Sequence, residues 1–124
     1  MTRAILPDSR LHPAIRERVA ALHSDVIHEV EAAIAANRVV VVGMAFNPFP
    51  AKARRLLDDT GVVHRYIEYG SYLSQWRRRN ALKMWTGWPT FPMVFVKGVL
   101  VGGFTDLEKL AQSGELHRMI AAAD

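Results

Sequence analysis

Hydrophobic residues recur every three or four positions along the first third of the chain, as in a helix with one buried face. The apolar positions are Ile15, Val19, Leu22, Val26, Val30 and Ile34. They follow His12-Pro13, a dipeptide suited to a helix start, and Asn37 ends the segment. The pattern predicts one long helix over residues 13–36, or two helices broken near Ser24-Asp25.

The pattern then changes to short continuous runs. Val39–Val42 is an uninterrupted β-branched run, which is typical of a strand buried on both faces. Lys97-Gly98 separates two further apolar runs and indicates a hairpin turn. The other expected elements are a helix over 48–60, a strand over 62–68, a helix over 73–86, strands over 92–96 and 99–101, and a helix from Thr105 to the end.

The order of these elements narrows the fold. A β-α-β unit requires a parallel pair of strands with a right-handed crossover, whereas the hairpin requires an antiparallel pair. The sequence therefore predicts an α/β fold with a mixed four-stranded sheet flanked by helices. A chain of 124 residues, half of them hydrophobic, is long enough for one core and too short for two comfortable domains.

Composition excludes several kinds of chemistry. The sequence has no cysteine, which rules out disulfides, thiolate nucleophiles and cysteine-ligated metals. Its histidines show no metal-binding spacing, so we expect no metal site. The net charge of +4 favours anionic partners, although surplus Lys and Arg on a solvated surface also explains it.

Two classes of partner are disfavoured. No apolar run approaches the roughly 18 residues of a membrane span, and the N-terminus lacks the apolar centre of a secretory signal, so we expect a cytoplasmic protein with no membrane partner. Tryptophans beside Arg77–Arg79 would suit stacking on a nucleic acid. However, Trp76 and Trp85 fall at core spacing on the expected helix, which favours packing instead.

The stretch WPTFPMVFVKGVLVGGFTDL, residues 88–107, resembles the C-terminal half of a glutaredoxin. LKMWTGWPTFP, residues 82–92, is most similar to the monothiol branch of that family, and the resemblance extends back to Val39. It implies a thioredoxin-like, three-layer α/β/α fold for residues 38–124. Residues 1–37 would form an additional N-terminal helical extension packed on that domain.

The resemblance places Asn47-Pro48-Phe49-Pro50 where a glutaredoxin has Cys-Pro-Tyr-Cys or Cys-Gly-Phe-Ser. In the family the first cysteine is a thiolate at a helix N-terminus, and asparagine cannot ionise or form a mixed disulfide. We therefore expect no catalytic residue and no thiol–disulfide exchange. Asn followed by Pro is also a favoured helix start, so capping alone can explain Asn47.

The resemblance also implies a glutathione site. Phe91, before a cis Pro92, would pair with the extended ligand, a helix N-terminus would take the γ-glutamyl carboxylate, and Arg79 would take the glycine carboxylate. The implied site residues are Asn47, Phe49, Arg79, Thr90, Phe91, Pro92, Gly103, Phe104, Thr105 and Asp106. The family's lysine ahead of the cysteine has no equivalent at Met44 or Ala45.

Structural explanations remain open for several of these residues. Thr105 with Glu108 fits a capping box, Asp106 suits a first helical turn, and Phe104 fits a contact with the core. Arg77–Arg79 fit a solvated helix face.

The predicted function is a cysteine-less glutaredoxin-like module that binds glutathione, a γ-glutamyl-like small molecule, or an extended segment of a partner protein. The alternative is a glutathione-dependent transferase or isomerase in which Asn47 orients the glutathione thiolate. An iron–sulfur cluster is not expected, because no protein thiolate would hold it.

Overall fold

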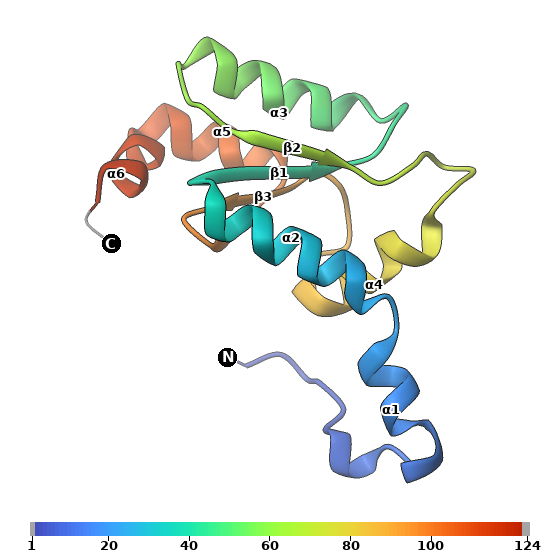
Figure 1. Ribbon diagram of the computed structural model, residues 1–124. Helices are drawn as coiled ribbons and strands as arrows, with labels where there is room; N and C mark the ends of the chain where they lie inside the picture. The colour runs from blue at the N-terminus through green and yellow to red at the C-terminus, as the bar shows by residue number, and fades with distance from the viewer. Residues whose placement is uncertain (1, 123–124) are drawn as a thin grey trace.

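The computed structural model of the protein describes residues 2–122. Four strands and a series of helices alternate along the chain, as Figure 1 shows. The elements are η1 (Asp8–Arg10), α1 (Pro13–Ala21), α2 (Ser24–Ala36), β1 (Val39–Gly43), α3 (Pro48–Asp59), β2 (Arg65–Glu68), α4 (Trp76–Thr86), β3 (Met93–Val96), β4 (Val99–Gly102), α5 (Phe104–Ser113) and α6 (Glu115–Ala121).

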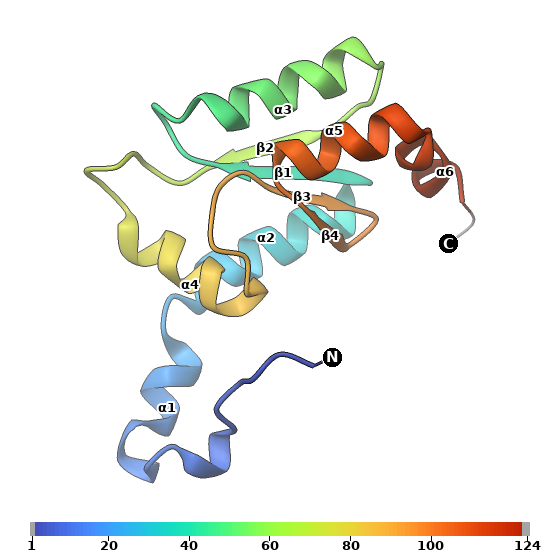
Figure 2. The same ribbon diagram turned by 180° about the vertical axis from the view of Figure 1, so that it is seen from behind.

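The strands form one mixed sheet in the order β2-β1-β3-β4. β1 runs parallel to β2 and antiparallel to β3, and β3 runs antiparallel to β4. The predicted mixed four-stranded sheet is confirmed. Helices cover both of its faces, with α2 and α4 on one and α3, α5 and α6 on the other (Figures 1 and 2).

The central strand explains the continuous apolar run in the sequence. Val40 and Val42 pack in the cluster beneath α2 and α4, whereas Val39 and Val41 pack in the cluster beneath α3, α5 and α6. Because side chains alternate between the two faces of a strand, both sets must be apolar.

The N-terminal helical segment divides at His23, whose backbone is left-handed (φ 47°). This break agrees with the second of the two alternatives predicted for residues 13–36. α2 contributes Val26, Val30 and Ala33 to the core, but α1 buries none of its residues. The expectation of one buried apolar face is therefore wrong for α1. This helix precedes the turn at His23 and projects away from the sheet (Figure 1).

Several other boundaries and burial predictions need correction. β2 begins at Arg65, and α4 begins at Trp76, later than predicted. Trp76 is 55% exposed because it lies in the first turn of α4, whereas Trp85 stacks on Phe95 in the core as expected. The C-terminal helix breaks at Gly114, whose positive φ of 81° separates α5 from α6. No helix within residues 2–122 is long and apolar enough to cross a membrane.

The different environments of α1 and α2 can be tested by unfolding. Val30→Ala should lower the free energy of unfolding by about 1–3 kcal/mol, because it removes buried methyl groups and leaves a cavity. Val19→Ala, on the exposed stripe of α1, should change it by less than about 0.5 kcal/mol. Urea unfolding followed by circular dichroism measures both. Equal losses for the two variants would show that α1 is as well packed as α2.

Candidate functional site

A groove of about 400 Å³ lies at the end of the sheet where α3 and α5 both begin (Figure 2). The start of α3, the segment before β3 and the start of α5 form its walls. It is lined by Asn47, Pro48, Phe49, Tyr72, Trp88, Thr90, Phe91, Pro92, Gly103, Phe104, Thr105 and Asp106. Every site residue expected from the sequence lines it except Arg79.

Asn47 caps α3 and at the same time joins two walls of the groove. Its Oδ1 accepts a hydrogen bond from the Phe49 N–H (3.0 Å), which satisfies a free donor of the first helical turn. Its Nδ2 donates to the Phe91 carbonyl oxygen (3.4 Å). The capping interpretation is confirmed, and the side-chain oxygen and one of the two amide hydrogens are engaged inside the protein.

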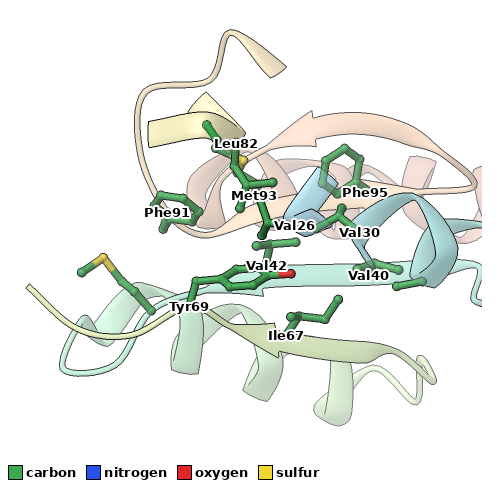
Figure 3. Packing of buried hydrophobic residues seen from close by; sticks show 13 residues of the cluster. Val26, Val30, Val40, Val42, Ile67, Tyr69, Leu82, Phe91, Met93 and Phe95 are labelled. Atoms are coloured by element: carbon green, nitrogen blue, oxygen red, sulfur yellow. The ribbon is translucent and has the colours of Figure 1, made fainter. Parts of the chain in front are cut away.

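The segment before β3 borders the groove with Thr90, Phe91 and Pro92. The Phe91–Pro92 peptide bond is cis, the isomer that the resemblance implies. The Phe91 side chain is buried in the cluster beneath α2 and α4, where Figure 3 shows it with Val42 and Tyr69. A buried side chain fixes the position of the main chain that borders the groove.

The start of α5 offers main-chain donors. Gly103 is its N-cap, and the Gly103 N–H donates to the Asp106 carboxylate (3.0 Å). The predicted Thr105–Glu108 capping box is therefore wrong by two residues, because the helix starts earlier than the sequence suggested. Gly102 has φ 118°, and a Cβ there would collide with the Asp106 carboxylate. Phe104 and Thr105 lie in the first turn, where backbone N–H groups have no acceptor within the helix.

Arg79 lies outside the groove, which corrects both interpretations of this residue. Its side chain is only 7% exposed, and its guanidinium donates to the carbonyl oxygens of Tyr69 (2.9 Å) and Ser74 (2.5 Å). It neither faces solvent nor reaches a carboxylate in the groove. Instead it ties the loop over residues 69–75 to α4, and that loop carries Tyr72 to the groove wall.

Tyr69 anchors the same loop from the other side. Its hydroxyl donates to the Glu29 carboxylate on α2, and its ring is buried. Burial, together with the hydrogen bond to Glu29, raises the pKa of the Tyr69 hydroxyl above its ordinary value. The neutral hydroxyl therefore persists as a donor well into the alkaline range.

Two lysines beside aromatic residues of the groove were missed by the sequence reasoning, although neither lysine lines the groove itself. The Lys83 ammonium lies 5.8 Å from the centre of the Phe91 ring, and the Lys52 ammonium lies 4.9 Å from the centre of the Phe49 ring. Lys83 falls within the glutaredoxin-like stretch over residues 82–92, so the resemblance could have indicated it. Tyr72 gave no such signal, because only the tertiary contacts of its loop bring it to the groove.

Trp88 also lines the groove, and its buried indole N–H has no hydrogen-bond partner among residues 2–122. Within the described residues no group of three or more His, Asp or Glu side chains is placed to hold a metal ion.

Comparisons with known proteins agree with this architecture. The model of the glutaredoxin family matches residues 39–101. A glutaredoxin-like protein of Dictyostelium discoideum is 54% identical over 94 residues, which cover 76% of each chain. The protein belongs to the glutaredoxin family. A probable monothiol glutaredoxin 2 of Rickettsia conorii is 36% identical over 98 residues, covering 75% of this glutaredoxin-like chain and 89% of the relative.

The solved structure of a buckwheat glutaredoxin–glutathione complex shares the fold. It superposes with a TM-score of 0.71, covers 81% of this chain and 91% of its own, and is 23% identical. The thioredoxin-like fold is thus confirmed. The protein is a family member without cysteine, in which an asparagine caps the helix that carries the cysteine motif in the family pattern.

Restoring the cysteine tests the geometry at residue 47. In Asn47→Cys the thiol should have a pKa about one unit below the free value of about 8.5, because the N-terminus of α3 favours the anion. Ser113→Cys, at the exposed C-terminal end of α5, should show no such depression. The pH dependence of the alkylation rate measures both values. An unshifted or raised pKa at residue 47 would mean that the thiol does not meet the helix N-terminus.

Proposed function

We propose that this protein is a non-catalytic binding module whose groove holds glutathione without exchanging thiols. The observation that carries the proposal is that the groove keeps groups suited to binding the ligand but has no cysteine to react with it. Main-chain groups of Phe91, Phe104 and Thr105 border the groove, whereas Asn47 replaces the nucleophile and is used as a helix cap.

The two carboxylates of glutathione and its central residue can each be assigned a group of the protein. The free N–H groups at the start of α5 suit the γ-glutamyl carboxylate, since helix N-termini bind anions. The backbone of Phe91 suits pairing with the central residue of the ligand. Lys83, beside Phe91, suits the glycine carboxylate, a role that the buried Arg79 cannot take.

The same main-chain groups suit an extended segment of a partner protein. Such a segment would pair with Phe91 in the manner of an added strand and would compete with glutathione for the groove. Glutathione is the first ligand to test because the groove includes a helix N-terminus suited to anions, and Lys83 lies beside the groove residue Phe91.

A glutathione-dependent transferase is less well supported. Such an enzyme would use Asn47 to orient the glutathione thiolate by hydrogen bonding. Yet Oδ1 already accepts from the Phe49 N–H, and Nδ2 already donates to the Phe91 carbonyl. One amide hydrogen is left, so Asn47 could offer the sulfur only a single neutral donor to stabilise its thiolate.

Glutathione binding can be followed by amide chemical shifts. Millimolar glutathione should shift the amide signals of residues 47, 49, 91 and 103–106, because these residues border the groove. Lys83→Gln should weaken binding by about fivefold, the loss expected for a partly exposed ion pair worth about 1 kcal/mol. Lys109→Gln, at an exposed position on α5, is the matched control and should bind as the wild type does. Absence of shifts in the wild type would disprove glutathione binding.

The absence of redox and transfer chemistry is a separate prediction. The purified protein should reduce neither insulin nor a mixed disulfide of glutathione above the buffer rate, because it has no thiol. It should also leave the reaction of glutathione with chlorodinitrobenzene at its uncatalysed rate. Acceleration of the second reaction, with contaminating enzymes excluded, would favour the transferase over the binding module.

A further inference from the structure

The end of the groove at Asn47 is walled by aromatic rings. Phe49 and Phe104 lie with their ring centres 6.3 Å apart, one on α3 and the other on α5. Tyr72 adds a third ring from the loop over residues 69–75. Phe49 is 44% exposed and Tyr72 is 64% exposed, so both retain apolar surface that a ligand would cover.

A further exposed ring precedes Asn47 in the sequence, although it does not line the groove. Phe46, directly before Asn47, is 87% exposed and has a left-handed backbone with φ 62°. A bulky residue rarely adopts this conformation, and such strain persists where the surrounding structure enforces it. The adjacent Ala45 N–H donates to the Gly70 carbonyl (2.6 Å), which joins this turn to the loop that carries Tyr72.

A free thiol gains little at this end of the groove. The side chain at the family's cysteine position has its carbonyl oxygen and one amide hydrogen engaged within the protein. A free thiol is also mostly protonated at neutral pH, so the nearby Lys52 ammonium has little charge to attract. An uncharged apolar group, by contrast, would contact the rings and remove their surface from water.

We propose that the preferred ligand is a glutathione S-conjugate, that is, the γ-glutamyl tripeptide with an apolar group on its sulfur. This inference rests on the proposed function, because the tripeptide is held by the same backbone groups and Lys83. The apolar substituent extends from the sulfur toward Phe49 and Tyr72. No bond to the protein forms or breaks, so the absence of a cysteine is no obstacle.

Calorimetric titration of the full chain with four compounds tests the inference. The compounds are glutathione, S-methylglutathione, S-hexylglutathione and S-hexylcysteine. S-hexylglutathione should bind at least tenfold more tightly than glutathione, with the S-methyl compound between them. S-hexylcysteine, which lacks the γ-glutamyl and glycyl groups, should bind more weakly than S-hexylglutathione by a similar factor.

Variants locate the preference. In Phe49→Ala and in Tyr72→Ala the ratio of the S-hexylglutathione affinity to the glutathione affinity should fall at least threefold. Val63→Ala removes an exposed apolar side chain that does not line the groove, and the ratio should not change. Using a ratio cancels any general loss of binding caused by the substitutions.

The outcomes separate this inference from the proposed function. If glutathione binds and S-hexylglutathione binds no more tightly, the preference for conjugates is wrong and the glutathione module stands. If neither tripeptide binds, both proposals are wrong. If S-hexylcysteine binds as tightly as S-hexylglutathione, the rings form a general apolar surface, and the preference for a conjugated tripeptide is wrong.

Discussion

The structure depends on the burial of β1 on both of its faces. Four consecutive valines, Val39–Val42, contact the two hydrophobic clusters alternately and are almost completely hidden from solvent. A strand in this position requires helices on each side of the sheet and neighbouring strands on each edge. The three-layer arrangement and the place where the chain leaves the sheet follow from this constraint.

Gly43, at the end of β1, links the buried strand to the groove because α3 packs closely against it. A Cβ at this position would lie 2.8 Å from the Pro50 Cβ and 2.8 Å from the Tyr66 hydroxyl. The first turn of α3 therefore packs directly over the end of the strand. That close approach sets Asn47 opposite Phe91, and their hydrogen bond connects the two sides of the groove. Backbone geometry, more than any charged side chain, builds the site.

Local patterns in the sequence allowed the sheet to be predicted, and the resemblance to glutaredoxins allowed most of the groove residues to be predicted. Continuous valines, a glycine turn and an Asn-Pro helix start each specify nearby backbone, and the order of the elements specifies the sheet. Arg79 could not be placed in this way. Its neighbours Arg77 and Arg78 are exposed, whereas tertiary contacts with the carbonyl oxygens of Tyr69 and Ser74 accompany the burial of Arg79. α1 was misjudged for a similar reason, since its apolar stripe resembles a core face although none of its residues is buried.

Asparagine at position 47 removes the possibility of a covalent bond between a ligand and this helix start. A thiol at this position would form mixed disulfides, so its state would depend on the balance of oxidants and reductants. Asparagine keeps the helix start intact and leaves no covalent record of an encounter with a ligand. If the groove holds glutathione as proposed, its occupancy would follow the concentration of that ligand, and no cysteine of this chain could be oxidised to change it.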